Sequence, residues 1–340
     1  MRRTALALVA TLLVVPALPA PAGAAVRQPA SRADDGLAVT GYALGSTPAE
    51  VVRRDADALT TVTIAAVPLS ADGRSVGAPT RDMTRLRGVA ARQGLRTELL
   101  LSNYSNGLGG FDERRAHRLL SSPAAIRRVA ERLATLVRSG GWDGVNVDLE
   151  LVREGDAGGL VRLVTALQQA MPPARTVSID ISASTSLRSY RERGYALGAL
   201  GRAVDVVQLM AYDQHGPGWS GPGAVGALAW QRASVRTALT RVPASRLDLG
   251  VAGYGYLWPG EGTSRRGRTV KPGGARAMAA AAGVRPVWHA TEGEWSARLP
   301  DGSTLWWADA RSYRQRVTLA RELGLHGLAV WRLGSADPLP

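Results

Sequence analysis

Eight apolar, strand-like runs recur along the 340 residues, and stretches with the pattern of amphipathic helices lie between several of them. The runs cover residues 37–42, 62–67, 97–103, 144–150, 177–182, 204–212, 247–254 and 327–333. Strands that alternate with helices predict a parallel sheet, and eight such strands predict an α/β protein built as a (β/α)8, or TIM, barrel. An open doubly wound sheet is the alternative.

Three of the intervening helices are well marked. One runs from Ser122 to Ser139, with Pro123 near its start and Gly140-Gly141 after its end. The other two cover residues 160–171 and 311–323, and the last is followed by Gly324. Pro near a helix start and Gly just past a helix end are the signals expected at these positions.

Residues 259–305 interrupt the alternation and are rich in Gly, Arg and Trp. Within them, two segments of strand character flank Asp301-Gly302, which predicts a hairpin with its turn at these two residues. We therefore expect a small α+β insertion between strands 7 and 8 of the barrel.

The first residues have the pattern of a secretory signal. Arg2 and Arg3 precede an apolar stretch at 5–15, and Ala22-Gly23-Ala24 fits an A-x-A cleavage site. We expect a signal peptide over 1–24, a linker over 25–36 and the barrel domain over 37–340, in a protein that is secreted, extracellular or cell-wall associated. The apolar stretch is shorter than the roughly 20 residues that cross a bilayer, and no membrane span is expected.

Composition excludes several classes of function. The net charge is +14, but the Arg residues are spread along the chain, so no basic stripe or motif predicts a nucleic-acid partner. The chain has no Cys, which removes thiol nucleophiles and thiolate metal ligands. Neither metal nor cofactor is expected, because the four histidines lack metal-ligand spacing: His117, His215, His289 and His326.

Residues 141–150 read G-W-D-G-V-N-V-D-L-E. In a strand, Asn146, Asp148 and Glu150 share one face. Glu150 would then end the fourth strand at the barrel mouth, where such barrels carry their chemistry. An ionised Asp148 would raise the pKa of Glu150 and keep it able to donate a proton. The alternative for this alternation alone is an exposed strand with a solvated acidic face.

The stretch D-G-V-N-V-D-L-E resembles the D-G-x-D-x-D-x-E signature of family 18 glycoside hydrolases, the chitinase-like enzymes. Q-L-M-A-Y-D at 208–213, L-G-V-A-G-Y-G at 249–255 and G-L-A-V-W-R-L-G at 327–334 resemble later motifs of that family in the expected order. The resemblance covers about residues 37–338. L-S-N-Y-S at 101–105, Y-D-Q-H-G-P-G at 212–218 and W-W-A-D-A-R-S at 306–312 are similar to the bacterial branch of spore-cortex-lytic N-acetylglucosaminidases.

This resemblance implies three catalytic residues. Glu150 would protonate the glycosidic oxygen and later activate water. Asp148 would orient the 2-acetamido group of the substrate, whose oxygen attacks the anomeric carbon, and Tyr212 would donate a hydrogen bond to that oxygen. The family is a substrate-assisted exception among retaining enzymes, so only 2-acetamido sugars would be cut.

The resemblance also implies substrate-binding residues. Trp331 would form the floor under the reacting sugar, with ordinary core packing as the alternative. Asp213 would bond a hydroxyl, with a purely structural role as the alternative. Asn146 stands where many chitinases have Asp, and we expect it to hydrogen-bond Asp148 and fix its orientation. Asp143 is expected to be structural, holding the turn into the strand.

Five further residues are candidates because they lie on barrel strands or in the loops after them. Core packing is the alternative for the tyrosine and the methionine, and an exposed loop is the alternative for the histidine. These candidates are Tyr42, Gln208, Met210, His215 and Asn103.

The sequence therefore predicts a secreted, monomeric retaining glycoside hydrolase that cleaves β-1,4 bonds at N-acetylglucosamine in peptidoglycan or a chitin-type polymer. One alternative is an inactive, chitinase-like lectin on the same barrel, although such relatives lose the acid that Glu150 supplies here. Another is an endoglycosidase acting on protein-linked glycans. No G-x-S-x-G elbow or phosphate-binding loop supports a serine hydrolase or a phosphate-binding enzyme.

Overall fold

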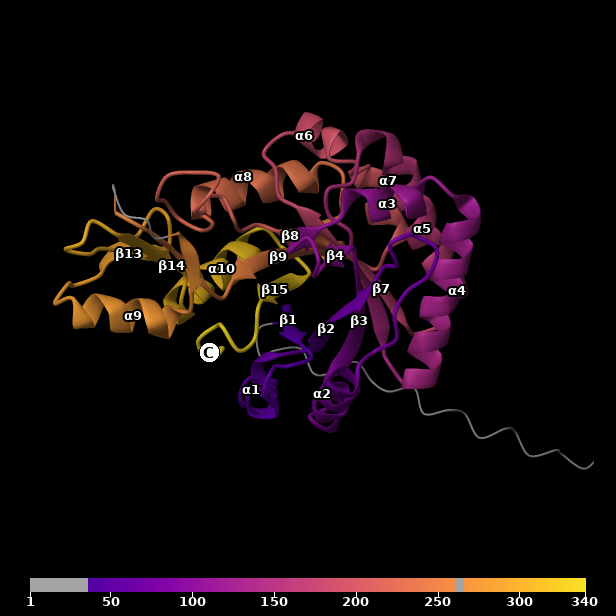
Figure 1. Ribbon diagram of the computed structural model, residues 1–340, viewed down its shortest axis with the longest axis horizontal. Helices are drawn as coiled ribbons and strands as arrows, with labels where there is room; N and C mark the ends of the chain where they lie inside the picture. Colours follow the sequence, from indigo (N-terminus) through magenta and orange to yellow (C-terminus); the bar gives the residue numbers. More distant parts are fainter. Residues whose placement is uncertain (1–35, 261–265) are drawn as a thin grey trace, which may run out of the picture.

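The computed structural model describes residues 36–260 and 266–340, and eight parallel strands close into a barrel at its centre (Figure 1). Around the barrel the order is β1-β15-β9-β8-β7-β6-β3-β2. This closure confirms the (β/α)8 prediction over the open sheet. The strands are β1 (Ala38–Leu44), β2 (Thr61–Pro68), β3 (Arg96–Ser102), β6 (Gly144–Asp148), β7 (Thr176–Ser182), β8 (Val206–Met210), β9 (Leu247–Ala252) and β15 (Gly327–Trp331).

Helices cover the outside of the barrel, and Figure 1 shows α4 and α5 side by side on the flank opposite the insertion. The expected signal peptide, and all but the last residue of the expected linker, lie outside the described residues. The helices are α1 (Ala49–Arg54), α2 (Arg81–Arg92), α3 (Glu113–Leu120), α4 (Pro123–Gly140), α5 (Ala157–Ala170), α6 (Leu187–Glu192), α7 (Leu197–Ala203), α8 (Leu228–Leu239) and α10 (Ala310–Glu322). Short elements complete the barrel domain: η1 (Ala56–Ala58), η2 (Glu154–Asp156), η3 (Ala244–Arg246) and the hairpin of β4 (Tyr104–Ser105) with β5 (Gly110–Phe111).

Helix α4 shows how local sequence signals set the boundaries. The Ser122 side chain accepts a hydrogen bond from the Ala125 N–H, Pro123 occupies the first turn, and Gly141 ends the helix in the left-handed conformation with φ 67°. Only glycine adopts that conformation without steric cost. Buried Val129 and Leu133 lie on the face that packs on the barrel.

Strand β6 is buried along its whole length because both of its faces are covered. Val145 and Val147 join the main hydrophobic core, and Asn146 and Asp148 point the other way, into the barrel. Asp143, just before the strand, accepts hydrogen bonds from the Thr97 N–H (3.0 Å) and from Arg175 (2.8 Å). It ties the start of β6 to its two neighbours, which is the structural role predicted for it.

The insertion between the seventh and eighth barrel strands, β9 and β15, is a five-stranded antiparallel sheet with one helix packed against it (Figure 1). Its order is β11-β10-β14-β13-β12, and Asp301-Gly302 lie in the turn between β13 and β14 as predicted. The sheet begins at Gly255, earlier than the expected residue 259. Its elements are β10 (Gly255–Trp258), β11 (Arg268–Val270), α9 (Pro272–Ala281), β12 (Val287–His289), β13 (Glu294–Arg298) and β14 (Thr304–Trp307).

A buried ion pair fixes the insertion to the barrel. Arg316 on α10 and Glu294 on β13 each expose 1% of their side chains and lie 3.3 Å apart. Glu294 also accepts the N–H groups of Val225 and Gly226 at 2.7 and 2.9 Å. A buried pair whose remaining groups are hydrogen-bonded fixes geometry, since losing either partner would leave an uncompensated charge.

Five barrel strands end one or two residues earlier than predicted, and two of these, β6 and β8, lead into the site. β6 stops at Asp148 and not at Glu150, and β8 stops at Met210 and not at Tyr212. The backbone turns sharply directly after Glu150 and after Tyr212. The residues that follow them, Leu151 and Asp213, have φ values of 57° and 59°. Glu150 and Tyr212 therefore lie on the loops that leave the barrel mouth. Within the described residues, no helix is long and apolar enough to cross a membrane.

Candidate active site

Glu150 is held at the barrel mouth by its own main chain. The Asn103 side chain donates a hydrogen bond to the Glu150 carbonyl at 2.9 Å and accepts one from the Glu150 N–H at 3.0 Å. Asn103 is fully buried and also donates to the Asp112 carbonyl at 3.1 Å. We predicted Asn103 as a substrate-binding residue, but the structure uses its amide to hold the backbone that carries Glu150.

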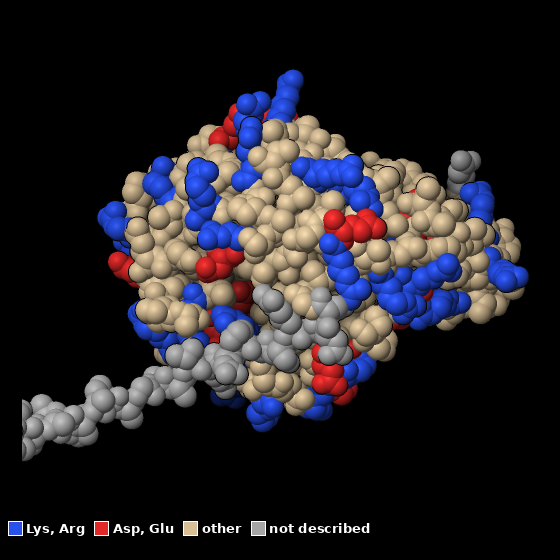
Figure 2. Space-filling view, turned by 180° about the vertical axis from the view of Figure 1, so that it is seen from behind, with Lys and Arg blue, Asp and Glu red and all other residues tan. Residues whose placement is uncertain are grey.

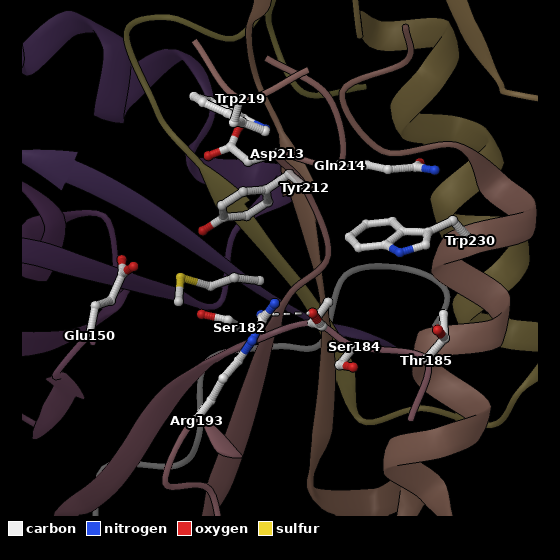
Figure 3. A pocket seen from close by; sticks show the side chains of 12 residues that line it. Glu150, Ser182, Ser184, Thr185, Arg193, Tyr212, Asp213, Gln214, Trp219 and Trp230 are labelled. Carbon is white, nitrogen blue, oxygen red and sulfur yellow. Dashed lines mark hydrogen bonds between the residues drawn. The ribbon is translucent and has the colours of Figure 1, made fainter. Parts of the chain in front are cut away.

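A cavity of 470 Å³ opens beside Glu150 (Figure 3). Met210, Tyr212 and Asp213 line it together with Glu150, so the structure brings four of the predicted site residues to one cavity. The Tyr212 hydroxyl points toward the side of the cavity where Glu150 lies, as Figure 3 shows. Trp219, an aromatic side chain that is 57% exposed, lines the same cavity.

Asp148 lines a second, larger cavity of 700 Å³ with Trp331 and Arg332. Trp331 also lines a third cavity of 330 Å³ with Asp213, Tyr254 and Arg332. The indole is partly exposed and packs beside Tyr42 with the ring centroids 5.5 Å apart. Trp331 therefore lies between cavities on two sides, which suits an aromatic floor under a pyranose ring.

Asn146 does not make the predicted hydrogen bond to Asp148. Its amide lies 2.9 Å from the Asp180 carboxylate and 3.0 Å from the Ser178 hydroxyl, with Gln208 and Tyr42 further away at 3.3 and 3.4 Å. One amide group donates two hydrogen bonds, so the two short contacts use both. The reason is the register of the barrel: Asn146 pairs with Ser178 of β7, which brings the β7 side chains within reach.

Tyr42 and Gln208 belong to the same buried network. The Tyr42 hydroxyl lies 2.5 Å from the Asp180 carboxylate and also contacts the Gln208 side-chain oxygen. Tyr42, Asn146 and Gln208 are at most 3% exposed and line none of the three cavities. They support the site from below, in place of the direct substrate contact that we predicted for them.

A further carboxylic acid lies deeper in the barrel. Glu98 on β3 accepts hydrogen bonds from Thr63, Thr176 and Ser178 at 3.0, 2.8 and 2.9 Å. Burial raises its pKa, although the three hydroxyl donors oppose the shift. Through Ser178, Glu98 is connected to Asn146, so polar groups continue inward from the site.

Burial is the main cause of the raised pKa values at the site. It raises the pKa of Glu150 to about 7, with smaller contributions from the charges of Asp180 and Asp213. Burial also raises the pKa of Asp148 well above its usual range, followed by the charge of Glu150. We predicted that Asp148 raises the pKa of Glu150. The structure attributes that effect to burial, Asp180 and Asp213, because the more deeply buried Asp148 keeps its own proton more readily.

Asp213 and His215 have different surroundings. The Asp213 carboxylate accepts hydrogen bonds from the hydroxyl groups of Tyr254 and Tyr256, the latter at 2.8 Å. It lines two of the cavities, as a sugar-binding residue should. His215 lines none of the three, and its ring lies against Gly223 in the loop after β8. His215 is therefore a partly buried loop residue, which matches neither the predicted substrate contact at these cavities nor the exposed loop histidine of the alternative.

Paired acids lie at the end of the fourth barrel strand, next to a sugar-sized cavity. A comparison with known protein families agrees with this arrangement. The model of the family "Glycosyl hydrolases family 18" matches residues 41–336. The chain belongs to glycosyl hydrolase family 18. Glycoside hydrolysis is accordingly its general activity.

Relatives in this family include the cortical fragment-lytic enzyme of Bacillus subtilis, 26% identical over 75% of this chain and 61% of that enzyme. This chain therefore spans about three fifths of that relative's length. The class V chitinase of Arabidopsis thaliana is 24% identical over 67% of this chain and 68% of its own.

Solved structures show the same fold. A class V chitinase from Pseudomonas fluorescens superposes with a TM-score of 0.80 at 26% identity, over 88% of this chain and 96% of that one. The spore cortex-lytic enzyme SleL of Bacillus cereus superposes with a TM-score of 0.79 at 20% identity, over 89% and 72%.

The sequence reasoning missed Asp180. It lies in S-I-D-I-S at 178–182, where polar and apolar residues alternate as they do in β6, and this signal was sufficient to place its carboxylate inside the barrel. No cluster of three or more potential metal ligands occurs among the residues that the structure describes.

Proposed function

We propose that this family 18 hydrolase cleaves β-1,4 bonds at N-acetylglucosamine residues by substrate-assisted catalysis, with retention of configuration. The observation that carries the proposal is the Asp148 carboxylate. Its Oδ1 is buried, has no hydrogen-bond partner among the described residues and belongs to a side chain that lines a cavity beside Trp331. A buried polar atom without a partner is costly, and the amide of a 2-acetamido group would supply the missing hydrogen bond.

In the first step, Glu150 gives its proton to the glycosidic oxygen, and the bond from that oxygen to the anomeric carbon breaks. The substrate's acetamido oxygen attacks the anomeric carbon and forms a cyclic oxazolinium ion. The Asp148 carboxyl group accepts a hydrogen bond from the acetamido N–H and so stabilises the positive charge that develops there. The Tyr212 hydroxyl donates to the acetamido oxygen and so helps to hold it for attack.

In the second step, the Glu150 carboxylate takes a proton from a water molecule, and the water oxygen attacks the anomeric carbon. The bond from that carbon to the acetamido oxygen breaks, so the oxazolinium ring opens and the acetamido group is restored. Two displacements at one carbon restore the original configuration. Glu150 then holds a proton again, as its raised pKa favours. A pKa of about 7 suits a group that must be an acid in one step and a base in the next.

Asp180 acts as a positioning residue in this proposal. Its carboxylate accepts hydrogen bonds from the Asn146 amide and the Tyr42 hydroxyl, at 2.9 and 2.5 Å. Many family members carry a carboxylate where this chain has Asn146, and here the neighbouring strand brings one into the same buried network. Besides burial, the charge of Asp148 raises the pKa of Asp180, Asp180 raises that of Glu150, and Glu150 raises that of Asp148, which couples the three acids.

The inactive-lectin alternative has no support among these observations, because the acid at position 150 is present and lies at the cavity. Export from the cell, expected from residues 1–24, is part of the proposal and agrees with a polymeric extracellular substrate. The names of the relatives refer to cortical fragments and to chitin, so peptidoglycan and chitin-type chains are the two candidate substrates.

The test is product analysis by mass spectrometry after incubation with N-acetyl chito-oligosaccharides and, separately, with peptidoglycan. The wild type is expected to release fragments with N-acetylglucosamine at the new reducing end. Glu150→Gln should abolish release, and Glu154→Gln, which changes an exposed acid four residues away, should not. Full activity of Glu150→Gln would contradict the proposed acid. Binding of both glycans by the wild type without any cleavage would favour the lectin.

A further inference from the structure

Two arginines face the cavities on either side of the proposed reaction centre. Arg193 lines the 470 Å³ cavity that also contains Glu150, and Figure 3 shows its guanidinium pointing into that cavity. Arg332 lines both the 700 Å³ cavity of Asp148 and the 330 Å³ cavity of Asp213. The site thus has a cation on each flank.

Arg332 is partly buried and has no acidic partner. Its guanidinium forms no hydrogen bond or salt bridge with a residue that the structure describes, and burial alone lowers its pKa. Of the other five partly buried arginines that the structure describes, three pair with an acid, as Arg115 does with Asp112 at 3.1 Å, and two donate hydrogen bonds to main-chain carbonyls. A partly desolvated cation without a counter-ion is unfavourable, so this position suits an anionic ligand group.

Arg193, unlike Arg332, is exposed to solvent, but it also has no acidic partner within the described chain. Its only hydrogen bond within the described chain is to the Ala183 carbonyl at 3.3 Å, which leaves most of its five donors free. Guanidinium groups match the geometry of carboxylates by forming two parallel hydrogen bonds. Both arginines are therefore available to carboxylates that enter the cavities.

The two arginines lie on opposite sides of the scissile bond. Glu150 must face the leaving group to protonate it, so its cavity, with Arg193, takes the leaving-group sugar. The 700 Å³ cavity with Arg332 contains Asp148 and Trp331 but not Glu150. It takes the reacting sugar, which Asp148 and Trp331 contact, and the next sugar on the side away from the leaving group. A matching substrate would carry carboxylates on both neighbours of the reacting N-acetylglucosamine.

We infer that the cleft binds a glycan in which N-acetylglucosamine alternates with carboxylate-bearing sugars, namely peptidoglycan strands with free lactyl groups on muramic acid. This inference rests on the proposed function and names its substrate. In intact peptidoglycan the lactyl carboxyl is joined to a peptide as an amide and carries no charge. The reaction that supplies the substrate must therefore be an amidase reaction that removes the peptides.

A neutral chitin chain would leave both guanidinium groups without an anionic partner. The bulk charge of the protein acts in the same direction, since +14 attracts a polyanion. On the face shown in Figure 2, Lys and Arg lie in separate groups, so this charge supplies general attraction and not a defined site. The two cleft arginines supply the specificity.

The experiment compares three forms of the same glycan strands: free lactyl carboxylates, lactyl groups capped as methylamides, and strands that still carry their peptides. We expect the wild type to cleave the free form with kcat/KM about tenfold or more above the capped form, the factor that a charge-assisted hydrogen bond gives. The peptide-bearing form should resemble the capped one. Preference for it over the free form would assign the arginines to peptide carboxylates and overturn the inference.

Arg332→Gln and Arg193→Gln should each lower the ratio of free to capped kcat/KM, and the double variant should bring it close to one. Arg132→Gln removes an equal charge from the exposed face of α4 and should leave the ratio unchanged. An unchanged ratio in the double variant would overturn the inference. The affinity of Glu150→Gln for free and capped strands gives a second readout. If the wild type cleaves no glycan strand, the proposed function fails. The ratio of the affinities of Glu150→Gln for free and capped glycan strands still tests the inference, and a ratio close to one would overturn it.

Discussion

The pH dependence of the reaction follows from the surroundings of Glu150. Its pKa rises from 4.5 to about 7 because the carboxyl is buried and because Asp180 and Asp213 lie nearby. With the ordinary value, only about 0.3% of this group would be protonated at pH 7, whereas a pKa of 7 leaves about half protonated. The shift is therefore worth a factor of about 150 in the concentration of the acid form at neutral pH.

The assay is kcat/KM for an N-acetyl chito-oligosaccharide between pH 4 and 9 at constant ionic strength, since this constant reports the free enzyme. We predict an alkaline limb with its midpoint near pH 7 and a fall of about tenfold per pH unit above it. Asp213→Asn removes a neighbouring negative charge and should move the midpoint to lower pH. Glu154→Gln, at an exposed position, is the control and should not move it. A wild-type midpoint near 4.5, or an upward movement in Asp213→Asn, would refute the reasoning.

Thermal stability gives an independent check with a definite sign. A carboxyl whose pKa is higher in the folded state than in the unfolded state keeps its proton on folding, so its contribution lowers stability as pH rises from 4.5 to 7. Glu150→Gln removes this term. The free energy of unfolding of Glu150→Gln, relative to that of the wild type, should therefore increase as pH rises through that range, by about 3 kcal/mol at most. A loss relative to the wild type would contradict the assignment.

Three other substitutions test the supporting residues. Asp180→Asn should lower kcat by about tenfold or more, because the Asn146 amide loses its carboxyl acceptor. Asn146→Asp in the same chain should restore part of kcat by returning a carboxyl group to the network, and a double variant no better than the single one would count against this role. Asn103→Leu breaks both hydrogen bonds to the Glu150 main chain, so kcat should fall with little change in KM. Urea unfolding should show a free energy of unfolding lower by about 1–3 kcal/mol. A normal kcat would show that these two hydrogen bonds are not needed to place Glu150. Trp331→Ala should raise KM for oligosaccharides about tenfold through loss of the ring under the sugar, and an unchanged KM in steady-state assays would remove Trp331 from the binding site.

The barrel was predictable because its strands are short apolar runs with clear ends, and all eight appear within a few residues of the expected positions. The place of Glu150 followed from the same regularity, since side chains alternate along a strand and active sites gather where barrel strands end. The strand ends themselves were less predictable. Leu151 and Asp213 turn the chain through positive φ values. Leucine gives no local signal of such a turn, and aspartate, although enriched at positive φ, adopts it only in a minority of cases.

The partners of the polar residues could not be predicted in the same way. Asn146 lies on β6 and Asp180 on β7, 34 positions later, and only the register between the strands shows that they meet. Asn103 folds back on Glu150 across 47 positions. Arg332 has no acidic partner among the described residues. This depends on which side chains lie near it in space, and no local sequence pattern predicts that.

The measurement that tests the account most directly uses one oligosaccharide in two forms, fully N-acetylated and fully deacetylated. Proton NMR would follow the anomeric signals during the first minutes after the enzyme is added. Substrate assistance predicts that the acetylated form yields the β-anomer first, followed by slow mutarotation, and that the deacetylated form is not cut. First appearance of the α-anomer, or equal cleavage of the deacetylated chain, would contradict the central claim.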